Sequence, residues 1–407
     1  LACPATAQLP ASQFEEIFPA GGAASSTVEV SILGNNLDET DKLWFSHPGI
    51  TSKQKLSERN PFDETALPLE NTFLVTIAAN VPAGRYETRS HGKFGLSNPR
   101  SFMVGSVGDV SEVEPNGGND IPVWSEVDEG ENKKVLTNPA SELTLPATVN
   151  GKSNTAADVD WFRFEGTAKA RLLINGFAKR IDSKIDLSIT LYNADGSIVA
   201  ESRIGAGSDP LIDAILPTDG VYFVKIHDAL YRTGTGFYYR FSIGSQPHID
   251  FIFPPAGELG TNNKYTVYGC NLPGGVPTDL KVDGYPLEKV ETQIAVSANG
   301  TDKLVFPSLL GPHQGGMDGF EFRIGKGKDR SNPLLMTVAT APVVLEQDNN
   351  DRAEDPQKLS PPCEVAGKFY PQRDADWFSF EAKKDETWIL DVISQRLGLQ
   401  TDASLLV

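Results

Sequence analysis

An internal repeat constrains this 407-residue chain more than any other feature. Ile17–Pro19 (IFP) returns as Ile252–Pro254 after 235 residues, and Ser97–Pro99 (SNP) returns as Ser331–Pro333 after 234 residues. A single hydrophobic core rarely grows past roughly 250–300 residues, so the length by itself predicts two to four domains. The repeat arranges these domains as two copies of one unit.

The two copies share a second pair of sequence blocks. Glu112–Asn116 (EVEPN) corresponds to Glu346–Asn350 (EQDNN) at an offset of 234 residues, and Asp158–Glu165 (DVDWFRFE) corresponds to Asp374–Glu381 (DADWFSFE) at an offset of 216. The first copy therefore carries about 18 additional residues between its two blocks. We interpret the highly charged part of this insertion, Glu126–Lys134, as a solvated loop.

Strand patterns fill both parts of each unit. The first part, residues 12–106, contains short alternating runs such as Val28–Ile32 and Phe73–Ile77, separated by turns with Gly, Pro and Asn. The second part, residues 107–245, contains longer runs such as Val221–Ile226. No stretch shows a clear helical period over three turns. The pattern predicts an all-β protein built from tandem antiparallel sandwiches.

Net charge excludes one class of partner. The chain carries 36 Lys and Arg residues against 54 Asp and Glu residues, a formal net charge of −18. Phosphate backbones are bound by clustered Lys and Arg, so we expect no nucleic-acid partner, whereas the acidity suits hard cations. No apolar run approaches the roughly 20 residues of a transmembrane helix, so we expect no membrane span.

The first residues indicate export. We interpret residues 1–11 as a signal-peptide remnant and tail, because Ala5–Ala7 (ATA) has the A-x-A form of a signal-peptidase site. Two alternatives stay open, a lipoprotein box with an acylated Cys3 and a disordered alanine-rich tail. We expect a secreted protein, located extracellularly, on the cell surface or in the periplasm.

The second copy is the shorter one. Val407 corresponds to Leu191, and the first copy continues for about 53 residues beyond that point, to Gly244. We expect the last domain to be truncated, with unpaired sheet edges. Continuation of the chain beyond Val407 is then an expected partner of this domain.

These motifs resemble two known domain families. Ile17–Gly22 with Gly34–Leu37, and their counterparts from Ile252 onward, are similar to an IPT/TIG immunoglobulin-like domain. The Glu-x-Glu-Pro-Asn start, the Asp-x-Asp-Trp-Phe-x-Phe block and Gly220–Ile226 resemble the bacterial pre-peptidase C-terminal (PPC) domain. The resemblance implies TIG sandwiches at 12–106 and 246–341, a jelly-roll PPC sandwich at 107–245, and the N-terminal half of another at 342–407. It also implies large secreted bacterial proteins in which the PPC domain is not catalytic.

The PPC resemblance further implies a calcium site. In the calcium-binding relatives, the Glu-x-Glu-x-Asn segment and the acidic run before the aromatic pair supply ligands, and calcium takes roughly six to eight oxygen ligands. The corresponding residues are Glu112, Glu114, Asn116, Asp158 and Asp160 in the first copy, and Glu346, Asp348, Asn350, Asp374 and Asp376 in the second.

Strand periodicity supports this geometry. Asp160 shares parity with Asp158, Phe162 and Phe164, and the two phenylalanines are expected in the core. The carboxylates would then lie at the core-side mouth of the strand, where a cation or an arginine must compensate them. Two alternatives stay open: the aspartates cap a turn beside a solvated linker, or Arg180 pairs with Asp160.

Aromatic side chains offer a second kind of site. Trp161 and Trp377 have opposite parity to the core phenylalanines, which predicts that they cover the outer face of the sheet. There they would bind sugar rings or collagen, or pack against the adjoining TIG domain. A further aromatic-rich surface is predicted near the end of the first PPC domain, at Tyr222, Tyr231, Phe237, Tyr238 and Tyr239.

No catalytic motif accompanies these features. The five histidines lie outside any H-E-x-x-H, and the sequence has neither a G-x-S-x-G elbow nor a P-loop. We therefore expect a non-enzymatic β-sandwich array that acts as a structural spacer or adhesion module, stiffened by calcium at the TIG–PPC junctions. Its partner would be an extracellular protein or polysaccharide. The alternative is a substrate-targeting module of a secreted hydrolase whose catalytic domain lies outside this chain.

Overall fold

A computed structural model describes residues 10–58, 66–118, 120–122, 124–127, 133–136, 140–203, 209–282, 284–299, 314, 316–370, 373–398, 401 and 403–407. The chain is essentially all-β, as predicted. Helical structure among these residues is confined to short 3-10 turns, which are η1 (Lys179–Ile181), η4 (Gly327–Asp329) and η5 (Gln395–Leu397). The expected signal-peptide remnant lies almost entirely outside the described residues.

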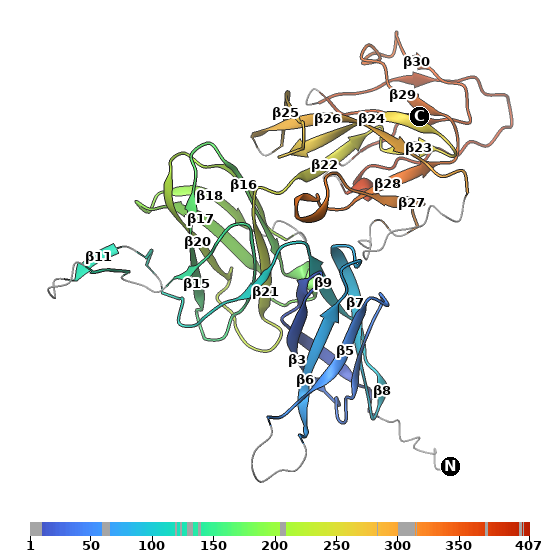
Figure 1. Cartoon of the computed structure of the whole chain (residues 1–407). Coiled ribbons are helices and arrows are strands. Elements are labelled where there is room, and N and C mark those ends of the chain that lie inside the picture. The colour runs from blue at the N-terminus through green and yellow to red at the C-terminus, as the bar shows by residue number, and fades with distance from the viewer. Residues whose placement is uncertain are drawn as a thin grey trace, which may run out of the picture. The chain divides into compact units, whose positions relative to one another are not determined.

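The first sandwich pairs a four-stranded sheet with a five-stranded one (Figure 1). The first sheet has the order β1 (Gln13–Phe18), β3 (Thr27–Asn35), β6 (Pro68–Ile77), β5 (Ile50–Leu56). The second has the order β2 (Gly21–Ala23), β9 (Arg100–Gly105), β7 (Gly84–Gly92), β4 (Lys42–Phe45), with β8 (Gly95–Leu96) on β7. Alternate side chains such as Val30, Phe73, Tyr86 and Phe102 are buried between the sheets, as the period-2 pattern predicts.

The second sandwich has two five-stranded sheets. One has the order β13 (Ser141–Glu142), β15 (Val159–Gly166), β20 (Gly220–Asp228), β17 (Leu187–Asn193), β18 (Ile198–Arg203). The other has the order β10 (Asp109–Ser111), β14 (Ala147–Lys152), β21 (Tyr238–Gly244), β16 (Arg171–Phe177), β19 (Leu211–Ile215). Phe162 from one sheet meets Phe241 from the other at 5.1 Å between ring centroids, inside the largest apolar cluster.

Pairing in both sandwiches departs from the antiparallel prediction at the edges. The edge pairs β2–β9, β10–β14 and β13–β15 are parallel, whereas the interior pairs are antiparallel. A parallel edge strand follows from a chain that crosses from one sheet to the other without reversing direction. The two ends of the charged insertion are strands, because β11 (Trp124–Val127) and β12 (Lys133–Leu136) pair antiparallel. Residues 128–132 of the predicted loop lie outside the described residues.

The second copy repeats the strand order of the first sandwich, although its second sheet has three strands among the described residues where the first copy has five. Its sheets have the orders β22 (His248–Phe253), β24 (Asn262–Cys270), β26 (Tyr285–Ala295), β25 (Val276–Val282) and β23 (Ala256–Glu258), β28 (Leu334–Ala339), β27 (Gly319–Phe322). The repeated Ser-Asn-Pro motif has the same function in both copies. Asn98 bonds the backbone N–H and C=O of Phe14 at 2.7 and 2.9 Å, and Asn332 bonds those of Ile249 at the same distances.

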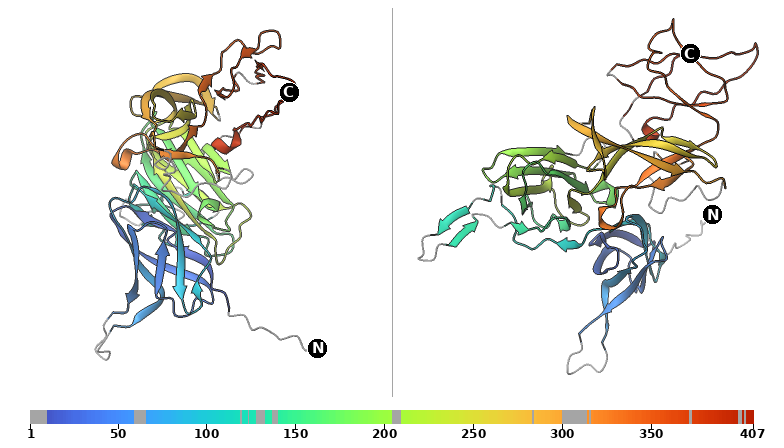
Figure 2. Two further views of the ribbon diagram at one scale, coloured as in Figure 1. Left: turned by 90° about the vertical axis from the view of Figure 1, so that its right-hand side faces the viewer. Right: turned by 45° about the horizontal axis from the view of Figure 1, so that its top comes forward.

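The segment that follows is mostly irregular (Figure 2). It contains two short parallel pairs, β29 (Val343–Leu345) with β31 (Glu364–Ala366), and β30 (Gln357–Lys358) with β32 (Phe378–Ser379). Trp377 is 44% exposed and Ile389 92% exposed, although their counterparts Trp161 and Leu173 are 0% and 7% exposed. An apolar segment that is buried in the first copy is therefore exposed in the second.

The chain divides into two compact units, Leu1–Ser245 and Gln246–Val407, so each unit holds one copy of the repeat. In the first unit the two sandwiches meet at a contact that we call the joint. Its apolar part is Ala20, Ile181 and Tyr238 with Phe18, Met103 and Phe177. The Ser101 N–H also donates to Asp182 Oδ2 at 2.7 Å. Among the described residues, no helix has the length and apolarity needed to cross a membrane.

Candidate metal centre

The linker after the first sandwich is bonded to the start of β15. The N–H of Trp161 donates to the Asn116 carbonyl at 2.8 Å, and its indole Nε1 donates to the Gly118 carbonyl at 2.8 Å. Gly117 forms an isolated bridge with Asp160. A side chain could not replace the glycine hydrogen in this conformation, since a Cβ at Gly117 would lie 2.6 Å from the Val159 carbonyl oxygen. The Glu-x-Glu-Pro-Asn segment is thereby held against the aspartates of β15.

The parity prediction for β15 is confirmed. Phe162 and Phe164 belong to the main core cluster. Asp160, which has the same parity, is 2% exposed, and Asp158 at the mouth of the strand is half-buried.

Three carboxylates converge at this mouth, and we call them the acidic cluster. One oxygen each from Glu114, Asp158 and Asp160 lies within 4.8 Å of the other two. Two ligands on opposite sides of a calcium ion are about 4.6–5.2 Å apart, since each Ca–O distance is roughly 2.3–2.6 Å. The exposed Glu114 leaves the cluster open to solvent on one side.

Asn116 lies against the acidic cluster, and its side chain is 1% exposed. In the orientation that gives both ends of the amide a partner, its nitrogen donates to Glu114 Oε2 at 2.9 Å and to Asp160 Oδ1 at 3.0 Å. Turning the amide over would present its oxygen to the space between the same two carboxylates, so Asn116 would act as a cation ligand only in that second orientation.

Glu112 and Asp160 share one hydroxyl group. Tyr239 Oη lies 2.8 Å from Glu112 Oε2 and 2.8 Å from Asp160 Oδ2. A phenol has a single proton to donate, so one of these carboxyls must hold its own proton or be neutralised by a cation. Burial, together with the neighbouring carboxylates, raises the pKa of Glu112 to about 7 and that of Asp160 to about 9.

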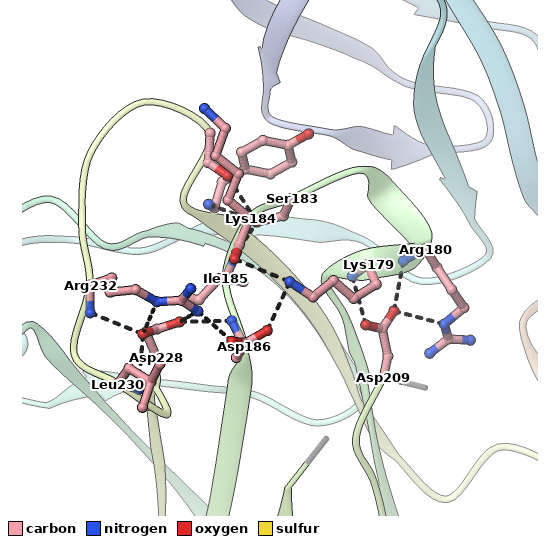
Figure 3. A network of polar contacts seen from close by, with 12 residues as sticks. Lys179, Arg180, Ser183, Lys184, Ile185, Asp186, Asp209, Asp228, Leu230 and Arg232 are labelled. Atoms are coloured by element: carbon pink, nitrogen blue, oxygen red, sulfur yellow. Dashed lines mark hydrogen bonds and ion pairs between the residues drawn. The ribbon is translucent and has the colours of Figure 1, made fainter. Parts of the chain in front are cut away.

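The two alternative interpretations fare differently. Arg180 does not pair with Asp160, because its Nε bonds Asp209 at 2.9 Å (Figure 3). Asp158 does cap a turn, accepting the Asn154 N–H at 2.6 Å. Among the described residues, no Lys or Arg side chain pairs with Asp160.

Figure 3 shows a separate polar network, which is fully paired within the protein. Asp228 has a 0% exposed side chain and accepts bonds from the N–H groups of Asp186, Leu230 and Arg232 and from the Arg232 guanidinium. Burial alone would raise its pKa, but these hydrogen bonds hold the pKa at about 2. Such a carboxylate braces a loop and has no need of an ion.

The second copy assembles a related group from a different residue. One oxygen each from Asp351, Asp374 and Asp376 lies within 4.8 Å of the other two. Asp348, the sequence counterpart of Glu114, is exposed and is not among these three. Asp351 occupies the position of Gly117, so its carboxylate takes the third place in the group.

Polar atoms around this second group lack partners. Asn350 is 1% exposed, and neither its side-chain oxygen nor its nitrogen has a hydrogen-bond partner. Glu346 accepts the Lys368 N–H at 2.7 Å, but its Oε1 is buried and unpartnered. Burial and the Glu346 carboxyl raise the pKa of Asp376 to about 7. These orphaned groups match a site that an ion would complete.

The sequence interpretation missed Asp351, and it placed Tyr239 on an aromatic surface instead of beside the carboxylates. Tyr239 shares strand parity with Phe241 and Ile243, which are core residues, and a buried tyrosine hydroxyl needs a polar partner. That pattern would have placed the hydroxyl near the aspartates. Nothing in the sequence distinguishes Asp351 from the neighbouring acidic residues.

The predicted aromatic surfaces are largely buried. Trp161 is 0% exposed and packs in a cluster with Val159, Phe223, Ile121, Ala140 and Tyr192, all from the second sandwich itself. The prediction that it binds a ligand or packs on the first sandwich is therefore wrong. Tyr222, Tyr238 and Tyr239 are also buried, whereas Tyr231 stays 44% exposed and stacks on His227 at 4.8 Å.

Comparison with known proteins gives distant structural likenesses. No protein-family model and no curated protein sequence matches the chain. A pre-peptidase C-terminal domain of a collagenase from Bacillus anthracis is similar, with 17% identity, 26% of this chain and 93% of that chain covered, and a TM-score of 0.22. SGBP-B of a Bacteroides ovatus mixed-linkage glucan utilization locus, in complex with a heptasaccharide, has 12% identity, coverages of 57% and 75%, and a TM-score of 0.19.

Carbohydrate-binding modules of a β-sandwich superfamily are also similar, with 11% identity, coverages of 58% and 96%, and a TM-score of 0.15. The all-β assignment rests on the strands of this chain, and none of these likenesses assigns it a function.

Proposed function

We propose that this chain is a non-enzymatic, secreted β-sandwich array that acts as a structural spacer or adhesion module. In this proposal, a calcium ion stabilises the second sandwich of each unit at the linker that enters it. The ligands in the first copy are Glu114, Asn116, Asp158 and Asp160, with Glu112 and water available to complete the coordination.

One observation carries the proposal. Oxygens of Glu114, Asp158 and the buried Asp160 converge, and among the described residues no Lys or Arg side chain pairs with Asp160. In the second copy the buried side chain of Asn350, the counterpart of Asn116, has no hydrogen-bond partner. The carboxylates come from two separate segments, the linker and the strand β15. An ion that binds both segments stabilises the folded form by its binding free energy, because the unfolded chain lacks the site.

Ligand chemistry favours calcium over other metals. The three converging groups are all carboxylates, with neither His nor Cys among them. Oxygen-only sites suit Ca²⁺ and Mg²⁺, and Mg²⁺ demands near-octahedral geometry at roughly 2.0–2.1 Å. Carboxylates that come from two separate segments and stay open to solvent on one side suit the larger ion, which tolerates irregular coordination.

Isothermal titration of the full chain, first depleted with EDTA, tests the proposal. We expect calcium to bind at the first copy and to raise the thermal midpoint, whereas magnesium at the same concentration does so weakly. Asp41→Asn, which alters an exposed carboxylate paired with His91, should bind like the wild type. The proposal would be overturned if millimolar calcium produced no binding heat and no shift of the thermal midpoint.

A second candidate function is binding of an extracellular polysaccharide through Tyr231. Its ring is exposed beside Leu230 at 68% exposure, in a turn that Asp228 braces. Tyr231 has a φ of 56°, a conformation that bulky residues rarely adopt. Co-sedimentation with insoluble polysaccharides, compared between wild type and Tyr231→Ala, tests it, and equal retention of both proteins would end it.

A further inference from the structure

Lys152 contacts both the acidic site and the joint. Its backbone N–H donates to Glu112 Oε1 at 2.6 Å, next to the hydroxyl that Glu112 shares with Asp160. Its side chain reaches the first sandwich, where Nζ lies 2.6 Å from Glu16 Oε1 and 4.3 Å from the centroid of the Phe18 ring. One residue at the end of β14 is therefore bonded to both places.

Glu16 depends on this lysine. It is 3% exposed, and its other oxygen accepts the Gly236 N–H of the second sandwich at 2.7 Å. A buried carboxylate that loses its cationic partner is strongly destabilised. Closure of the joint at Glu16 therefore requires that Lys152 stays in place.

The second unit repeats the arrangement with its own residues. Lys368, the counterpart of Lys152, donates its N–H to Glu346 at 2.7 Å and places Nζ 4.5 Å from the centroid of the Phe253 ring. Glu346 and Phe253 are the counterparts of Glu112 and Phe18. Phe251 stands in the position of Glu16, so the second unit keeps the lysine–aromatic contact and lacks the buried ion pair.

We propose that Lys152 couples occupancy of the cation site to closure of the joint, so that calcium stiffens the contact between the two sandwiches of a unit. Lys368 acts in the same way in the second unit, with weaker coupling because no glutamate corresponds to Glu16. This inference rests on the proposed calcium site.

The coupling has a direct physical route. Without a cation, Glu112 and Asp160 compete for the single Tyr239 hydroxyl proton. An ion bound to Asp160 neutralises that carboxylate and leaves the Tyr239 hydroxyl to Glu112, which fixes Glu112 and, through its other oxygen, the Lys152 backbone. Because coupling between two equilibria is reciprocal, weakening the joint must weaken calcium binding by the same factor.

The experiment compares the full-length wild type with Glu16→Gln and Lys152→Met. Both variants keep the side-chain length approximately and remove the ion pair, while leaving the acidic cluster unchanged. The matched control is Lys55→Met, because Lys55 pairs with Glu29 at the same 2.6 Å distance on the exposed face of the first sandwich. Calcium affinity comes from titration calorimetry, and joint closure from hydrogen–deuterium exchange of the Gly236 amide and of the Ser101 amide.

We expect calcium to slow exchange at Gly236 and Ser101 in the wild type and in Lys55→Met. In Glu16→Gln and Lys152→Met we expect this slowing to be lost and calcium affinity to fall about five-fold or more. Wild-type affinity in both variants, or unchanged exchange in a wild type that binds calcium, would overturn the coupling alone. A wild type that binds no calcium would overturn the proposed function and the coupling with it.

Discussion

The acidic groups of the two copies are built from corresponding segments, but the residues that contact their carboxylates differ. In the first copy, Tyr239 on β21 bonds both Glu112 and Asp160. In the second copy, Glu346 Oε1 and both side-chain polar atoms of Asn350 have no hydrogen-bond partner. The linker and the segment that follows it thus bring carboxylates together in both copies, and in the first copy Tyr239 also bonds Glu112 and Asp160 from a third segment.

The copies also obtain their third carboxylate from different places. Glu114 supplies it in the first copy, two residues before Asn116, and Asp351 supplies it in the second, one residue after Asn350. The backbone is held in the same way in both copies, because the backbone carbonyls of Asn116 and Asn350 each accept the backbone N–H of a tryptophan at 2.8 Å. The position of the backbone is therefore repeated more faithfully than the identity of the ligand.

Removing the buried aspartate of each copy is expected to have the largest effect. Asp160→Asn should weaken calcium binding at the first copy about 100-fold, or ~2.7 kcal/mol, because it removes the charge that is least accessible to water. Asp376→Asn should weaken the second copy by about 10-fold, since that group is more open. Calorimetry on the two variants measures the calcium affinity of each copy. Equal losses of affinity would show that the contact of Asp160 with Tyr239 on β21 does not affect calcium binding.

Tyr239→Phe should make the first copy resemble the second. The Glu112 and Asp160 carboxyls lose their shared donor, and we expect the cation-free chain to lose roughly 1–3 kcal/mol of unfolding free energy. Urea denaturation in EDTA and in calcium measures the change, and calcium should restore most of it. Tyr222→Phe is the control, because it removes a buried hydroxyl bonded to the Thr218 carbonyl at 2.7 Å. Calcium should not rescue that control.

The ligand assignment in the second copy is tested by two substitutions. Asp351→Gly introduces the residue of the first copy and should weaken calcium binding at the second by about 10-fold, ~1.4 kcal/mol. Asp348→Ala should change the affinity by less than about two-fold, because Asp348 is exposed and outside the group. A larger loss of affinity in Asp348→Ala than in Asp351→Gly would identify Asp348 as the ligand, as the sequence predicted.

Proton release on calcium binding should also differ between the two copies. At pH 8, Asp160, whose pKa is about 9, should release about one proton when calcium binds, whereas Asp376, whose pKa is about 7, should release almost none. Calorimetry in buffers of different ionisation enthalpy counts these protons. Equal proton release at both copies would mean that Asp160 and Asp376 have the same pKa in the cation-free protein.

Stability without calcium should follow the same titrations. A folded-state pKa raised above the ordinary carboxyl value means that the folded chain binds more protons than the unfolded one. Stability is then highest below about pH 4 for these groups and falls as pH rises through about 7 and about 9. Calcium should flatten this dependence, and a cation-free midpoint that rises with pH over this range would contradict the assignment.

Local sequence patterns determined the architecture of this protein. Alternating apolar residues predicted the strands and the inward direction of Phe162 and Phe164, because side-chain direction in a strand depends only on parity. The repeat offsets predicted that the ligand segments would recur, and the acidic motifs placed Asp158 and Asp160 at the mouth of β15. Such features depend on neighbours along the chain, so the sequence contains them directly.

Only the tertiary structure decided which groups meet. Arg180 bonds Asp209 and not Asp160, Trp161 is covered by its own sandwich, and Tyr239 reaches the carboxylates from a strand about 80 residues away in the chain. Likewise, Lys152 connects the site to Glu16 across 136 residues of sequence. These contacts depend on how two sheets and two sandwiches pack, and long-range packing leaves no periodic signature in a single sequence.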